Sequence, residues 1–206
     1  FNGKVGFSNF KDLQLSNGDI INFIYQAWAH DQWVDDSGVT HTSGGWDIDT
    51  FVAFVQNQIN IDGIVNTLAN ATSSAIKPNA NLIFVSPSGM VVGASGVLNV
   101  GSLSVYTPSQ NTFELARSGL PTVTTVNDQN YALGTKVDKT WDPSVLNIVG
   151  PETIDGVQYA KNIDINGKII ARGSVELNGG TISVGTGTLD TNGLPNQGII
   201  ANLGSG

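Results

Sequence analysis

Two acidic residues, Asp47 and Asp49, have the type and spacing that acid–base chemistry on a polysaccharide requires. They alternate along the chain, so in an extended segment both carboxyl groups share one face. Polysaccharide-degrading enzymes use such a pair of carboxyl groups. Neither arginine of the chain, Arg117 or Arg172, is near them in sequence, and lysines are sparse. A polysaccharide-degrading enzyme, which would have a β-helical fold, is therefore the least favoured of the three functions that the sequence suggests. We expect no enzyme.

A second group of residues with ligand chemistry lies just before this pair. It consists of His30, Asp31, Asp35, Asp36 and His41. Imidazole and carboxylate groups suit zinc or calcium, but the chain has neither a helical His-x-x-x-His spacing nor an EF-hand spacing. Gly-x-Ser-x-Gly and Gly-x-x-x-x-Gly-Lys motifs are also missing. We expect a solvated polar loop here, with no metal and no cofactor.

Three tryptophans, Trp28, Trp33 and Trp46, lie among these acidic residues. Aromatic rings near carboxylates could form a patch that stacks on sugars. The same rings could instead pack into a small satellite core that anchors the loop. A carbohydrate- or receptor-binding adhesin module is therefore the second interpretation.

The composition limits the partners. The 206 residues fit one domain with a substantial core. Hydrophobic residues make up 40% and charged residues 13%, about half the usual charged share of roughly 25%. The net charge of −8 disfavours nucleic acid and anionic lipid headgroups. No apolar run approaches the ~20 residues of a membrane helix.

The chain has no cysteine, which excludes disulfides and thiolate chemistry. A reducing compartment or chance would explain this. Export in an unfolded state would explain it as well, because a premature disulfide would jam a narrow pore.

The second half of the chain has a short repeating rhythm. Apolar-x-apolar triplets at 163–165, 175–177 and 182–184 are followed by Asn-Gly or Gly-x-Gly. Each triplet places two side chains on one face, and each glycine-containing pair suits a turn. A meander of hairpins could use this pattern. Strands this short favour a β-helix, in which each coil stacks on the next. The pattern recurs at 59–64 and 98–105.

Other segments depart from the rhythm. Phe51, Val52, Val55 and Ile59 have helical spacing after Asp49, which predicts a short helix. Residues 5–15 alternate well enough to form a capping strand. Residues 26–50 and the proline-containing segment 109–160 are predicted to leave the helix body, the second as a β-hairpin on its flank. Residues 198–204 keep the rhythm without a visible cap, which suggests that coils follow.

The stretch from Asn79 to Val105 resembles the signature of the two-partner secretion domain, which begins filamentous haemagglutinin-type exoproteins. The family signature is Asn-Leu, two hydrophobic residues, one residue of any type and Asn-Pro-Asn-Gly-Ile, then Phe-Gly or Val-Gly, then Asn-Val-Gly-Gly or Asn-Val-Gly-Ser. The upstream residues from Phe7 to Phe23 resemble the opening Phe-x-x-Phe element of the family, and leukotoxin-like filamentous adhesins are most similar. The Asn-Pro-Asn-Gly of the family is replaced here by serines at its asparagine positions. The residues that carry the two motifs are Ser86, Pro87, Ser88, Gly89, Asn99, Val100, Gly101 and Ser102.

The resemblance implies a right-handed parallel β-helix with N-terminal capping strands and extra-helical excursions. It implies a secreted or cell-surface monomer that crosses the outer membrane through a barrel transporter, whose periplasmic polypeptide-transport-associated domains recognise this region. The two motifs would serve as structural turns, as transporter contacts or as both. The expected division of the single domain is 1–25 cap, 26–50 excursion, 51–108 signature coils, 109–160 second excursion and 161–206 further coils.

Overall fold

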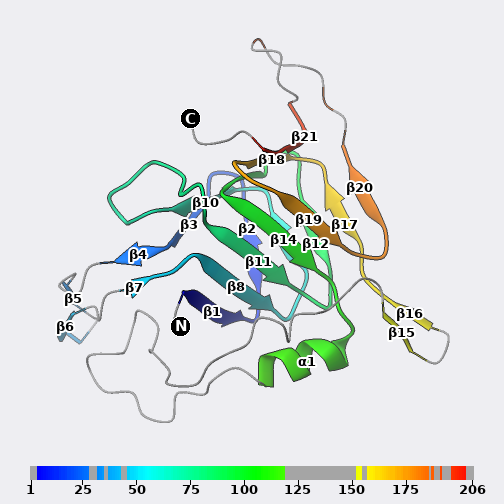
Figure 1. Ribbon diagram of the computed structural model, residues 1–206, viewed down its shortest axis with the longest axis horizontal. Coiled ribbons are helices and arrows are strands. Elements are labelled where there is room, and N and C mark those ends of the chain that lie inside the picture. Colours follow the sequence, from blue (N-terminus) through cyan, green and yellow to red (C-terminus); the bar gives the residue numbers. More distant parts are fainter. Residues whose placement is uncertain are drawn as a thin grey trace.

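The residues that the structure describes fold as a parallel β-helix of five coils (Figure 1). The computed structural model describes residues 4–27, 32–34, 37–42, 46–118, 152–154, 157–185, 187, 191 and 196–202. Each coil contributes one strand to each of three five-stranded sheets, and every neighbouring pair within these sheets is parallel. This arrangement confirms the all-β, β-helical prediction.

The strands of the five coils are short, as the triplets predicted. The first sheet has the order β1 (Val5–Phe10), β8 (Thr50–Val55), β11 (Asn81–Val85), β14 (Ser102–Tyr106) and β19 (Val175–Asn178). The second has the order β2 (Leu13–Leu15), β9 (Ile59–Ile61), β12 (Met90–Val92), β17 (Ile163–Ile165) and β20 (Ile182–Val184). The third has the order β3 (Ile20–Ile24), β10 (Ile64–Leu68), β13 (Val97–Val100), β18 (Lys168–Ala171) and β21 (Gly198–Ile200).

The segment predicted to cap the helix supplies β1, β2 and β3. Each of these strands occupies an end position in its sheet and pairs in parallel with the second coil. The N-terminal segment is therefore a complete first coil.

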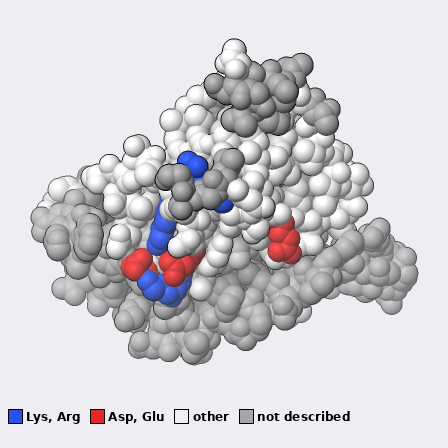
Figure 2. All heavy atoms as spheres, turned by 45° about the horizontal axis from the view of Figure 1, so that its top comes forward, with Lys and Arg blue, Asp and Glu red and all other residues white. Residues whose placement is uncertain are grey.

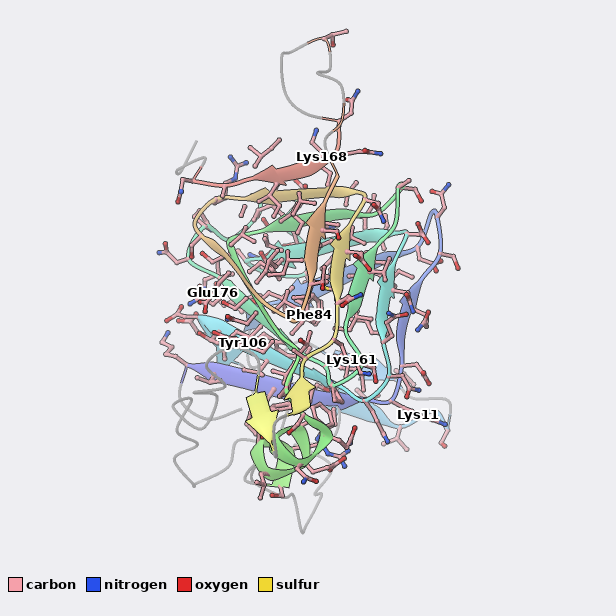
Figure 3. All side chains as sticks on the ribbon, turned by 90° about the vertical axis from the view of Figure 1, so that its right-hand side faces the viewer. Lys11, Phe84, Tyr106, Lys161, Lys168 and Glu176 are labelled. Atoms are coloured by element: carbon pink, nitrogen blue, oxygen red, sulfur yellow. The ribbon has the colours of Figure 1, made fainter. Side chains whose placement is uncertain are left out.

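The core lies inside the coils, where alternate residues of all three sheets meet. Phe84, Met90 and Leu98 of the third coil are fully buried there. Figure 3 shows Phe84 within the stack of coils. Because a residue pairs with its register partner in the next coil, inward positions stack into continuous apolar columns, such as Leu82 on Leu103. Burial of these columns is the main stabilising term for short strands.

Segments between the coils form the excursions. The first contains two antiparallel pairs, β4 (Gln26–Ala27) with β7 (Trp46–Asp47) and β5 (Gln32–Val34) with β6 (Thr40–Thr42). We call these four strands the arm, and Figure 1 shows β5 and β6 farthest from the coils. In the second excursion, β15 (Glu152–Ile154) and β16 (Val157–Tyr159) form the predicted type of hairpin.

The helix predicted at 49–61 is wrong. These residues form β8 and β9, and β8 carries apolar side chains on both faces. One face points into the core, and the other is covered by α1 (Gln110–Ser118), whose Phe113 and Ala116 pack on it. A strand that is buried on both faces loses the alternation that identifies strands, so Phe51, Val52 and Val55 mimic a helical stripe.

Helix α1 was not predicted, although its start carries a recognisable signal. Ser109 precedes the first turn, and its hydroxyl accepts a hydrogen bond from the backbone N–H of Thr112 at 3.2 Å. This is the geometry of an N-cap. The helix lies beneath the coils in Figure 1 and closes the outer face of the first sheet.

Candidate functional site

Ser86 to Gly89 form the corner between β11 and β12. Pro87 fixes its own φ for the turn, and Gly89 has a φ of 90°, which favours glycine. The corner is bonded to the coils on both sides: Ser86 N–H donates to Tyr106 O at 3.0 Å, and Gly89 O accepts from Ile59 N–H at 3.0 Å. The motif therefore locks the third coil to the second and fourth coils.

Serine hydroxyls do the bonding in this corner. Ser86 is fully buried, and its Oγ donates to Asn57 O at 3.0 Å and accepts from Ser88 N–H at 3.2 Å. Ser88 Oγ donates to Gln56 O at 3.2 Å at the exposed rim. Both serines thus contact the backbone of the corresponding corner in the second coil. Serine at these two positions, where the signature that the chain resembles has asparagine, supplies a side chain that satisfies neighbouring backbone groups.

Replacement of Ser86 by Ala should destabilise the protein by about 1–3 kcal/mol, because the change removes a buried donor and leaves Asn57 O without this partner. Urea unfolding followed by far-UV circular dichroism measures the loss. Ser88→Ala is the matched control, since its bond is exposed, and its effect should stay within about 0.5 kcal/mol. Equal effects of the two variants would contradict the assigned role of Ser86.

The second motif, Asn99 to Ser102, forms the corner between β13 and β14. Val100 is fully buried in the core, and Gly101 N–H donates to the hydroxyl of buried Thr67 at 3.0 Å. Ser102 N–H donates to Ala80 O at 2.7 Å, and Ser102 Oγ accepts from Ser174 N–H at 3.2 Å. This corner, which connects the third coil to the fourth, is thus also bonded to the second coil, to the loop before β11 and to the residue before β19.

Asn99 belongs to a ladder of amide side chains on the outer face of the third sheet. Its Nδ2 donates to Asn66 Oδ1 at 3.0 Å, and Asn66 Nδ2 donates to Asn22 Oδ1 at 2.9 Å. The three residues are register partners in the first three coils. The ladder was missed from the sequence because the spacings between its members, 33 and 44 residues, differ.

The acidic pair Asp47 and Asp49 lies at the base of the arm beside two lysines. Lys4 Nζ is 2.6 Å from Asp47 Oδ2, and Lys77 Nζ is 3.4 Å from both Asp47 Oδ1 and Asp49 Oδ1. We call these four residues the charged cluster. Figure 2 shows basic and acidic side chains side by side, whereas most of the other described residues on this face are uncharged. The two carboxylates do share a side, as predicted.

Lys77 is the most enclosed member of the charged cluster. Its side chain is 19% exposed, and its Nζ also donates to Ile48 O at 2.8 Å and lies 5.8 Å from the centre of the Tyr25 ring. Tyr25 in turn donates its hydroxyl to Asn81 O at 2.8 Å. The cluster therefore ties the arm to the loop before β11. It favours an ionised Asp47, whereas a glycosidase general acid needs a raised pKa.

The hydrogen bond from Lys4, helped by Lys77, holds the pKa of Asp47 below its ordinary value of 3.8. A depressed carboxyl pKa contributes stability above the unfolded pKa and loses it as the pH falls through the folded pKa. Asp47→Asn should therefore lose less stability than the native chain between about pH 5 and pH 2. Thermal unfolding at stepped pH checks this, with Asp12→Asn as the control. Identical pH profiles for Asp47→Asn and the native chain would refute the assigned shift.

The structure describes only some of the other residues that the sequence suggested as ligands. Trp33 lies on β5 opposite His41 of β6, and Trp46 lies on β7 opposite Ala27 of β4. Trp28, and with it His30, Asp31, Asp35 and Asp36, lies outside the described residues. Among the described residues, no three His, Cys, Asp or Glu side chains gather as metal ligands would.

Comparison with protein-family models, curated proteins and solved structures gives no match to this chain. None of the described helices is long and apolar enough to cross a membrane. The functional argument therefore rests on the residues of the chain and on the places that the coils give them.

Proposed function

We propose that this chain is the secretion-signal domain of a large exported adhesin or exoprotein. An outer-membrane barrel transporter with periplasmic polypeptide-transport-associated domains recognises the domain, which then nucleates β-helix folding outside the cell. The observation that carries the proposal is the ordered resemblance from Phe7 to Val105 to the two-partner secretion signature. The β-helical fold supports it, because that resemblance implies this fold.

The positions of the two motifs suggest how the domain would start folding. Each motif forms a corner whose backbone and side chains bond to neighbouring coils. In a solenoid, each repeat is stabilised by its neighbours, so folding that begins in a few coils propagates along the chain. A signal at the start of a fibre that fixes the first coils would supply the template for later ones.

Burial of the motifs suggests at which stage a transporter would bind them. Ser86 and Val100 are fully buried, and Pro87 and Gly101 are buried as well. A partner therefore has little access to these side chains once the coils have stacked. We infer that recognition acts on the unfolded chain, before export, and that the same residues build corners afterwards. A cysteine-free chain suits passage in this state.

The experiment is a release assay. The chain, preceded by an export signal, is expressed in a bacterium with and without a candidate outer-membrane barrel transporter from the same genome. Immunoblots of medium and periplasm should show release only with the transporter. Deletion of residues 86–102 should abolish release, whereas Leu115→Ala, which changes an exposed side chain of α1, should not. Release of the deletion variant at the native level would refute the proposal.

A carbohydrate- or receptor-binding role is the second candidate, and one observation favours it. The arm carries Trp33 and Trp46 on strands that lie outside the coils. A glycan array with the native chain and with a variant in which Trp28, Trp33 and Trp46 are alanine tests this role. Binding by the native chain alone would support it, and no binding by the native chain would remove it.

A further inference from the structure

The corner between β2 and β3 of the first coil carries an Asn-Gly pair, Asn17 and Gly18. Both residues are exposed, and Gly18 has a φ of 97°. The turn around them is closed by two hydrogen bonds, from Asp19 N–H to Ser16 O at 3.0 Å and from Ser16 N–H to Asp19 Oδ2 at 2.8 Å. Neither bond uses the backbone N–H of Gly18.

The surroundings of Gly18 are open. No described atom lies within 4 Å of the position that a Cβ on Gly18 would take. Within the described part of the chain, its N–H donates to no protein acceptor. This nitrogen is therefore accessible to solvent base and adjacent to the side-chain amide of Asn17.

We propose that Asn17 is a site of spontaneous deamidation. Solvent base removes the amide proton of Gly18, and the nitrogen attacks Cγ of Asn17. The new N–C bond closes a five-membered succinimide, and the side-chain nitrogen leaves as ammonia after taking up a proton. Water then opens either carbonyl of the ring and gives aspartate or isoaspartate. The reaction consumes one water and releases one ammonia, and it needs no enzyme or oxidant.

The modification would act on a tightly packed corner. Gly63 of the second coil lies directly under this turn: a Cβ on Gly63 would be 2.5 Å from Asp19 O and 2.8 Å from Ser16 O. Isoaspartate lengthens the backbone of the turn by one carbon, and either product adds a negative charge beside Asp19. Because Ser16 O and Asp19 O pack directly on Gly63, a longer backbone in this turn should weaken its packing against the second coil.

The chain contains a matched control in Asn166 and Gly167, at the equivalent corner of the fourth coil. Asn166 is exposed like Asn17, but Gly167 is buried. Gly167 N–H donates to Val92 O at 3.2 Å, and a Cβ on Gly167 would collide with Gly93 O and Gly96 O. The two Asn-Gly pairs thus differ in the hydrogen bonding of the glycine nitrogen, in the burial of the glycine and in its φ, which is positive only at Gly18.

The native chain is incubated at mildly alkaline pH, and peptide mass spectrometry follows both sites over time. Deamidation at Asn17 should be about tenfold faster or more, because the Asn166 site reacts only after local opening. In denaturant the two rates should become similar. Equal rates in the folded chain, or a faster Asn166, would overturn the proposal. Gly18→Ala should slow the reaction at Asn17 and leave Asn166 unchanged, and an unchanged rate at Asn17 would also count against it.

Discussion

Gly101→Ala should destabilise the β-helix by about 3 kcal/mol or more, a large share of the 5–15 kcal/mol that holds a typical domain folded. A Cβ at this position would collide with Ala80 O and would lie 2.5 Å from Lys77 O and 2.8 Å from Ala80 N. All three atoms are backbone, so no side chain can rotate to relieve the clash. The residues of the loop before β11 would have to move, and this movement would break the hydrogen bond from Ser102 N–H to Ala80 O.

Urea unfolding monitored by far-UV circular dichroism measures this loss. Gly185→Ala is the matched control, because the nearest atoms to its Cβ would be Ile165 O at 3.3 Å and Gln197 Oε1 at 3.4 Å. The control should shift the free energy of unfolding by no more than about 1 kcal/mol. A Gly101→Ala variant as stable as Gly185→Ala would show that this corner is not packed as described.

Phe113→Ala should undock α1 from the first sheet while the coils stay folded. The Phe113 ring is fully buried, 6.0 Å from the centre of the Phe54 ring at an interplanar angle of 61°. Truncation of a buried phenylalanine costs about 3–5 kcal/mol. A helix of nine residues is not stable alone in water, so loss of its anchor unfolds it. The outer face of β8, with Val52 and Phe54, would then be exposed.

Hydrogen exchange measured by mass spectrometry separates the two outcomes for this helix. Amides of residues 110–118 should exchange at nearly unfolded rates in Phe113→Ala, whereas amides of β11 and β14 should stay protected. Leu115→Ala on the same helix is the control, because Leu115 is 73% exposed and its loss should leave exchange unchanged. Retained protection of α1 in Phe113→Ala would contradict the role given to this side chain.

The architecture could be predicted because β-helix coils leave a local signal. The triplets at 163–165, 175–177 and 182–184 are β17, β19 and β20, and the Asn-Gly pair at 166–167 is a corner. Each of these features is determined by residues that are adjacent in the sequence, so the sequence pattern is enough to predict it. The first excursion was also predicted, because its tryptophans and acidic residues interrupt the alternation.

The remaining features depend on contacts between distant residues. The asparagine ladder requires the register of three coils, and the excursions between them have different lengths. Lys77 reaches Asp49 across 28 residues of sequence, so no spacing rule points to the charged cluster. Likewise, the sequence of β8 resembles that of a helix because α1 covers the outer face of this strand. Helix α1 follows β8 by more than fifty residues, so the sequence around β8 does not indicate this contact.

The most direct test of the central claim measures binding between this chain and the purified periplasmic domains of a candidate outer-membrane barrel transporter from the same genome. Ile165→Asp, which places a charge at a fully buried core position outside both motifs, should supply a form that is unfolded without denaturant, as circular dichroism can verify. We predict saturable binding of the unfolded form and weaker binding of the folded native chain, whose motif residues are buried. Deletion of residues 86–102 should abolish the binding. If neither form binds, or if the deletion variant binds as well as Ile165→Asp, the proposed secretion signal is wrong.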